Sequence, residues 1–515
     1  MRPRSISAPI SFVEKHGHLC LAALVVVSVA VHAVLALRWF GETDAVRLAN
    51  DALKALYDGS FHDLESQVYS TPLYLDGLRQ VLEWGLVSAR TIPVWMTVWS
   101  VLAGAAVTAG LFSFTKAVTR SAAMALAVAV LLQFDPAFFM FSIYGFPTMV
   151  AAGLFVLSVA VLPRAIAARR PPARGGLLLL AFLLYLAAVF IKVDVLLATA
   201  VFCLPVWLCV KGTRARALWI AGIVVAAGLS FVFFNLYSAH LVESVRPTGA
   251  WATHFSYFFN GIGAVWKGAT WSPLVRGAGA MTLPLVLIAA CLAVRTREGR
   301  STVAWLALAA LPLILNWAFM RGNSARHMLL PVVLLYPLLV FPLRSRVKGV
   351  WAVLLAAMLV VNYMAFAPTS NTVRPSGRLV ESSLLLRGRA ATLEATAKSV
   401  AGLPYPRVAE IGAGWFDPYV TYEVLLGGKY LSHSQTDGLP PTQTLVAGTD
   451  DGGTREYLLI YLPVTEQQLL GLAGQGYFLV LGDKSLVKLA QGHSELAGRW
   501  VSLDELTAAA KAGLR

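Results

Sequence analysis

Long runs of apolar residues, interrupted by short segments rich in Arg and Lys, fill the first two thirds of the chain. Eleven of these runs predict helices that span a membrane, because roughly 20 apolar residues cross a bilayer core. The predicted spans are 19–37, 93–114, 121–139, 144–162, 177–191, 193–210, 217–237, 281–294, 303–320, 328–343 and 350–366. The pattern therefore predicts an α-helical polytopic membrane protein with about 11 transmembrane helices.

Basic residues between the runs predict the topology, since Lys and Arg concentrate on the cytoplasmic side. Lys116 and Arg120 precede the apolar region 121–162, and the basic segment 164–174 follows it. Both flanks should lie on one side, so this region must cross twice and turn near Asp135 and Pro136. The next apolar region turns at Lys192 and Asp194 for the same reason.

With these turns, the inner segments hold 18 Lys and Arg residues and only two acids, Glu14 and Glu298. The N-terminus is predicted to be cytoplasmic and the C-terminus extracytoplasmic. The net charge of +15 then belongs to the membrane topology rather than to nucleic acid binding. The four cysteines all lie within apolar runs, which excludes a disulfide framework and a Cys/His metal site.

The composition supports the membrane class, with 57% hydrophobic and 13% charged residues and a mean hydropathy of +0.68. Residues 368–515 differ and predict a small extracytoplasmic α/β domain, so the chain divides into 1–367 and 368–515. Its expected strands are 407–411, 457–462 and 477–481, and its expected helices 386–400, 466–472 and 503–510. Segment 438–454, rich in Gly, Pro and Thr, is predicted to be a flexible loop.

The first outer loop, 38–92, carries the candidate chemistry. Thr43 is a predicted N-cap, and Ala and Leu at helical spacing after it predict an amphipathic helix along the membrane surface. Asp44 falls in the first turn, where the helix dipole alone is a sufficient structural reason for an acid. It also follows the first span directly, at the depth of a lipid head group. The bend Thr71-Pro72-Leu73-Tyr74 precedes a second amphipathic run, 75–86.

These features together resemble the GT-C superfamily of polyprenyl-phosphate-sugar-dependent glycosyltransferases, which includes protein O-mannosyltransferases and aminoarabinose transferases. The resemblance rests on Asp44 with Glu42 after the first helix, the helix ending at Asp58-Gly59, the bend at 71–74 and the segment 324–331. It covers the membrane half up to residue 366. The family's Asp-Glu or Asp-Asp pair is replaced here by Glu42-Thr43-Asp44, and its Arg-Tyr by Arg326-His327.

The resemblance implies roles for these positions. Asp44 would be the catalytic base, with Glu42 as the alternative, and Asp135 a second acid near the same pocket. Arg326 would hold the lipid phosphate, because Arg pairs with phosphate bidentately; its structural alternative is an interfacial anchor that snorkels. The remaining predicted binding residues at the outer mouth are His327, Lys192, Arg321, Lys267 and Tyr74. For Lys192, mutual neutralisation with Asp194 is the competing explanation.

The implied activity moves a sugar from a polyprenyl-phosphate carrier to a glycan, lipid or protein acceptor at the outer face of a bacterial plasma (inner) membrane. No nucleic acid partner is expected. A divalent cation, Mg²⁺ or Mn²⁺, stays open, with Asp44 and Asp135 as its ligands. Two alternatives remain: a transporter or flippase of lipid-linked saccharides, which usually shows paired half-repeats and polar residues at mid-membrane, and a non-catalytic scaffold.

Overall fold

The computed structural model describes most of the chain. The described residues are 7–40, 43–58, 71–209, 212–241, 281–319, 325–364, 367–369, 372–374, 379–412, 416–426, 442–448, 454–460 and 464–514. Their contacts form two compact units. The first comprises Met1–Leu37, Val68–Tyr74 and Val94–Leu386, and the second comprises Arg38–Gln67, Leu75–Pro93 and Arg387–Arg515. The sequence division at residue 367 differs, because it placed loop 38–92 with the membrane segments; it stays a prediction.

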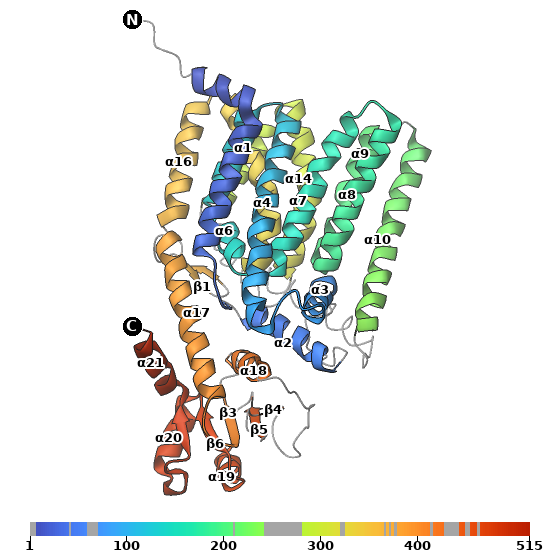
Figure 1. The fold of residues 1–515 in the computed structure, drawn as a ribbon. Coiled ribbons are helices and arrows are strands. Elements are labelled where there is room, and N and C mark those ends of the chain that lie inside the picture. The colour runs from blue at the N-terminus through green and yellow to red at the C-terminus, as the bar shows by residue number, and fades with distance from the viewer. Residues whose placement is uncertain are drawn as a thin grey trace, which may run out of the picture. The chain divides into compact units, whose positions relative to one another are not determined.

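The first unit is a bundle of apolar helices (Figure 1). Its elements are α1 (Ser7–Leu35), α4 (Ile92–Thr119), α5 (Ala122–Gln133), α6 (Pro136–Ile143), α7 (Pro147–Ala167), α8 (Pro171–Ile191), the 3₁₀ helix η3 (Val193–Phe202), α9 (Cys203–Cys209), α10 (Thr213–Leu241), α13 (Thr282–Ala293), α14 (Arg297–Phe319), α15 (Ala325–Leu335), the 3₁₀ helix η4 (Tyr336–Arg344), α16 (Lys348–Met364) and the hairpin β1 (Ala367–Thr369) and β2 (Thr372–Arg374).

Among the described residues, six helices are long and apolar enough to cross a membrane, or seven if the bent pair α5 and α6 counts as one span. By this length and composition the chain is a multi-pass membrane protein. Four further predicted spans correspond to shorter apolar helices: Val193–Phe202, Thr282–Ala293, Leu329–Arg344 and Lys348–Tyr363. The count of eleven spans therefore stays a prediction.

The predicted turn at Asp135 is a break between two helices rather than a tight reversal. Helix α5 ends at Gln133 and α6 begins at Pro136, with a bend of 68° between them. Proline at the first position of α6 needs no amide partner there, which explains where the new helix starts. The chain reverses only after α6, where Gly145 takes a φ of +69° before α7. The predicted span 121–139 therefore overruns this break, while the predicted span 144–162 corresponds to α7.

Four of the predicted inner segments meet at one end of the bundle. The Glu14 carboxylate accepts hydrogen bonds from the Ser121 hydroxyl (2.5 Å) and from the first amides of α5. Lys116 Nζ lies 3.0 Å from His18 Nε2. Arg344 donates to Glu298 Oε2 (2.9 Å) and to the Thr119 carbonyl. These contacts place the four segments together at one end of the bundle, and the membrane topology stays a prediction.

The second unit contains a five-stranded sheet, β3 (Arg407–Ile411), β4 (Thr442–Gly448), β5 (Thr454–Ile460), β6 (Phe478–Leu481) and β7 (Trp500–Ser502), in the order β4-β5-β3-β6-β7. Only β4 is antiparallel to its neighbour. The other elements of this part of the chain are α17 (Leu379–Ala401), α18 (Asp417–Leu425), α19 (Glu466–Gly474), α20 (Lys484–Gly492), a 3₁₀ turn (Ser494–Leu496) and α21 (Leu503–Gly513). Apolar side chains on one face of β3, β5 and β6 form a core with α19 and α20.

The expected strands and helices of this unit agree with the observed ones, and β3 has the expected bounds. The loop prediction for 438–454 is wrong over β4, which pairs along its whole length with β5. The Gly, Pro and Thr residues of this segment had suggested a loop. A ladder of backbone hydrogen bonds to β5 overrides that local preference.

Candidate active site

Helix α2 (Thr43–Asp58) positions the predicted base. Most of its apolar side chains, among them Val46, Leu48 and Leu53, are fully buried. Within the second unit α2 packs on α18, where Asn50 Nδ2 donates to the Pro418 carbonyl (2.8 Å). The amphipathic helix was therefore predicted correctly, but its apolar face is covered by protein, not by lipid. The second amphipathic run is α3 (Pro72–Glu83), and a 3₁₀ turn (Ala89–Thr91) precedes α4.

Asp44 lies in the first turn of α2, with its side chain 19% exposed. Arg47 Nη1, one turn further along, lies 3.6 Å from Asp44 Oδ1. Arg47 also acts on Asp417 at the start of α18, where its positive charge lowers the carboxyl's pKa against the larger effect of burial. Arg47 is thus shared between the predicted base and a second acidic group.

The second acidic group is a pair of buried carboxyls that the sequence analysis did not single out. Glu410, on the face of β3 opposite the α19–α20 core, is 1% exposed, and Asp417 is fully buried. The two carboxyls interact with each other, and no other described side chain donates to any of their four oxygens. Burial raises both pKa values, that of Glu410 well above its ordinary range. The signal in the sequence was a glutamate inside an otherwise apolar strand.

Helix α18 carries one more perturbed acid, Glu423. Burial raises its pKa to about 7, while Lys398 and Arg90 act in the opposite direction. The Tyr422 hydroxyl beside it donates to the Ala89 carbonyl (2.5 Å), which ties α18 to the end of the first outer loop. The helix on which α2 rests therefore carries two acids with raised pKa values.

Asp135 is held by the fold of the first unit. One carboxylate oxygen accepts from the Phe138 amide at the start of α6 (2.8 Å), and the other accepts from the Tyr336 hydroxyl (2.7 Å). The residue is 1% exposed. These bonds satisfy both oxygens and explain the residue as a buried helix cap. A role in substrate binding stays a proposal.

Lys192 and Tyr74 are also buried. Lys192, 8% exposed, follows α8 and forms an ion pair with Asp194 at 3.5 Å, as the competing structural explanation required.

Tyr74 lies in the first turn of α3 and is 5% exposed. Its hydroxyl has no hydrogen-bond partner among the described residues, and burial raises its pKa. A buried hydroxyl without a hydrogen-bond partner lowers the stability of the fold, so the Tyr74 hydroxyl is a candidate to bind a polar ligand group.

The remaining predicted residues lie wholly or partly outside the described residues. Glu42, Lys267 and Arg321 are outside them. Arg326 and His327 lie in the first turn of α15, but only their backbone is described. Asp44 belongs to the second unit, and Asp135 and Lys192 belong to the first. Within the described part of the chain, no cluster of three or more His, Cys, Asp or Glu side chains has the arrangement of a metal site.

No protein-family model and no curated protein sequence matches the chain. Among solved structures, it is similar to ArnT from Cupriavidus metallidurans in the apo state, with 14% sequence identity and a TM-score of 0.48 over 79% of this chain and 84% of that one. It is likewise similar to ArnT from the same organism bound to undecaprenyl phosphate, with 14% identity and a TM-score of 0.47 over 95% of this chain and 90% of that one.

Proposed function

We propose that this protein is a membrane glycosyltransferase of the GT-C type that moves a sugar from a polyprenyl-phosphate carrier to an acceptor hydroxyl at the outer face of the membrane. The observation that carries the proposal is the position of Asp44. Its partly exposed carboxylate stands in the first turn of α2, directly after the first membrane helix. A carboxylate at that place can meet a head group while the carrier's hydrocarbon chain stays in the bilayer.

In the proposed reaction, Asp44 accepts the proton of the acceptor hydroxyl as its oxygen attacks the anomeric carbon of the sugar. The bond between that carbon and the phosphate oxygen breaks, and the carrier leaves as polyprenyl phosphate with the bonding electrons. General base catalysis of this kind contributes about 10² to 10⁴ in rate. A cationic group must stabilise the departing phosphate, and we assign that role to Arg326.

The decisive experiment is Asp44→Asn in the full chain, reconstituted in lipid vesicles. Release of polyprenyl phosphate from a panel of polyprenyl-phosphate-linked sugars should fall about 10² to 10⁴-fold, because the amide cannot accept the proton. Asp51→Asn is the matched control. It makes the same change on the same helix, about 10 Å further along, and should leave turnover unchanged.

Other outcomes identify other mechanisms. If Asp44→Asn retains turnover and Glu42→Gln loses it, Glu42 is the base. If both variants retain turnover, the proposed mechanism is wrong. Movement of the intact lipid-linked saccharide across the membrane, without cleavage, would identify a transporter. A divalent cation is the alternative to arginine at the phosphate, and loss of turnover in EDTA that Mg²⁺ or Mn²⁺ restores would reveal it.

A further inference from the structure

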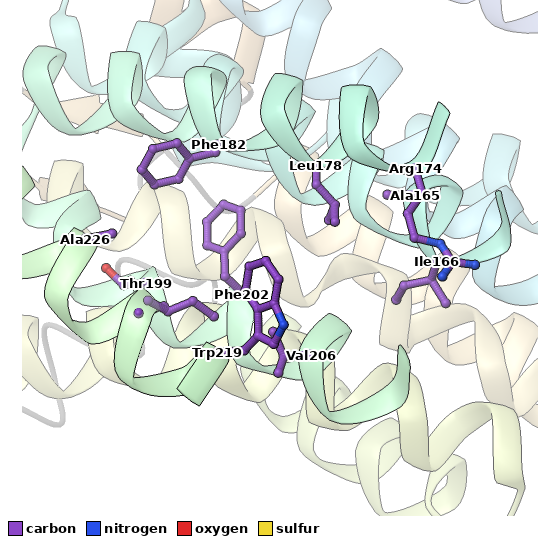
Figure 2. Close-up of a pocket in the computed structure, with 12 residues that line it drawn as sticks. Ala165, Ile166, Arg174, Leu178, Phe182, Thr199, Phe202, Val206, Trp219 and Ala226 are labelled. Atoms are coloured by element: carbon purple, nitrogen blue, oxygen red, sulfur yellow. The ribbon is translucent and has the colours of Figure 1, made fainter. Parts of the chain in front are cut away.

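A cavity of about 470 Å³ lies in the first unit between α8 and α10 (Figure 2). Residues of α7, η3 and α9 complete its lining. Its lining is almost wholly apolar: Leu178, Phe182, Phe202, Val206, Trp219 and Ile223. The one hydroxyl in the lining, that of Thr199, already bonds to Tyr185 and to the Leu196 carbonyl. The volume falls in the range of ligand sites, about 300–1,000 Å³.

Positive charge borders the cavity at one end. Beyond its lining, near the ends of α8 and α10, the Phe190 ring contacts the rings of Phe234 and Tyr237, each at 5.9 Å between centroids. Towards the starts of both helices the lining runs from Phe182 to Arg174, a length of about 12 Å of helix. The result is a narrow apolar slot that ends at a guanidinium.

Arg174 is suited to an anionic group. Its Nη2 donates to the Ala168 carbonyl (2.9 Å), which orients the side chain, and its buried Nε has no partner among the described residues. The described residues of segments 161–180 and 203–226, which flank this end of the slot, include six Arg and no Asp or Glu. Their excess positive charge complements a phosphate, which Arg binds with paired hydrogen bonds.

The slot also lies beside a helix with an exposed apolar surface. Along α10, Leu218, Val225 and Leu229 are each more than half exposed, as expected of a helix that faces lipid. An acyl chain beside α10 can therefore enter the slot without crossing water. We propose that this cavity binds an anionic phospholipid of the surrounding bilayer, with one acyl chain between α8 and α10 and the phosphodiester at Arg174. Basic sites between membrane helices on the cytoplasmic side recognise lipid head groups in this way.

The test is native mass spectrometry of the full chain in detergent, with phosphatidylglycerol and phosphatidylcholine added in turn. The wild-type chain should retain phosphatidylglycerol in preference to phosphatidylcholine. Arg174→Gln should weaken phosphatidylglycerol binding about tenfold, the effect of losing hydrogen bonds from a charged donor. Gly222→Leu tests the slot without altering charge. Gly222 lines the cavity, and a Cβ there meets no atom within 4 Å, so a leucine side chain can extend into the free space of the cavity. Phosphatidylglycerol binding should therefore weaken in Gly222→Leu.

Gly228→Leu is the matched control on the same helix. A Cβ there also meets no atom within 4 Å, but Gly228 does not line the cavity, so lipid binding should be unchanged. Equal retention of both lipids, or wild-type binding in both Arg174→Gln and Gly222→Leu, would overturn the proposal. So would displacement of phosphatidylglycerol by an equimolar polyprenyl phosphate, since the occupant would then be the carrier lipid.

Discussion

Buried carboxyl groups in this protein behave differently because their neighbours differ. Asp135 receives one backbone and one hydroxyl donor, so both its oxygens are satisfied. Glu410 and Asp417 have mainly each other, and burial raises their pKa values. Two adjacent buried carboxyls cannot both ionise at low cost, so the pair holds a proton where isolated acids would have lost it.

This proton makes the stability of the second unit depend on pH. A carboxyl whose pKa is raised by folding contributes its stability fully below the unfolded pKa, near the ordinary values of 4.5 and 3.8. That contribution is lost as pH rises towards the raised value. Each pH unit in this window costs up to about 1.4 kcal/mol, or about 3–6 °C in melting temperature. We expect the melting temperature of the chain in detergent to fall between pH 5 and 8.

Glu410→Gln should reduce that fall, because the amide does not titrate and can donate to Asp417. The remaining slope should come from Glu423, whose pKa of about 7 places it in the same range. The control is Glu495→Gln, an exposed residue of the same unit, which should keep the wild-type profile. An identical pH profile in Glu410→Gln would show that the pair is not the source.

Residue type and chain position were enough to select Asp44 and Asp135 as candidates, since each is an acid beside a predicted span. They were not enough to describe the surroundings. The hydroxyl that contacts Asp135 belongs to Tyr336, 201 residues away. The pairing of Glu410 with Asp417 depends on how α18 packs against β3, which no local pattern encodes.

At the scale of elements, α2 shows how one amphipathic pattern fits two environments. A helix with an apolar face buries it in lipid or in protein, and the sequence pattern is the same in both cases. Here α18 packs against α2. Two side-chain hydrogen bonds fix the contact, from Asn50 to the Pro418 carbonyl (2.8 Å) and from Tyr57 to the Leu425 carbonyl (3.0 Å). Trp39 also stacks on Tyr419, with 5.2 Å between ring centroids.

Asn50→Ala should therefore destabilise the second unit by about 1–3 kcal/mol, because it leaves the buried Pro418 carbonyl without its donor. The measurement is the melting temperature of the second unit's transition in detergent. Tyr57→Phe, which loses a partly exposed bond, should cost only about 0.5–1.5 kcal/mol. A larger loss in Tyr57→Phe than in Asn50→Ala would contradict the inferred importance of the buried contact.

At the scale of the whole molecule, the basic segments between helices organise the first unit. Glu14 binds the start of α5, and Arg344 joins Glu298 to the end of α4. Segments separated by up to about 330 residues in the chain thus meet at one end of the bundle. The apolar sequences of the helices between them do not indicate which end of each helix faces the cytoplasm, so the topology prediction depends on the charged residues in the connecting segments.

This arrangement predicts the labelling of introduced cysteines in a cysteine-free chain. Ser301→Cys and Val347→Cys, both at exposed positions next to the cluster, should react with a membrane-impermeant maleimide from the same side of oriented vesicles. Ser494→Cys, in the second unit, should react from the opposite side, where the predicted topology puts the C-terminus. Labelling of Ser301→Cys and Val347→Cys from opposite sides would contradict both the contacts and the topology.

The sequence by itself determined the membrane class, the positions of most apolar helices, and three strands and three helices after residue 386. These features follow from the composition of each segment and from the spacing of its hydrophobic residues, so each segment can be interpreted without the rest of the chain. The tertiary structure decided what covers α2, how β4 pairs with β5, where Asp135 finds its donors and that Glu410 and Asp417 are buried together. Each of these depends on contacts between segments distant in the chain, and their free energy exists only once those segments have met.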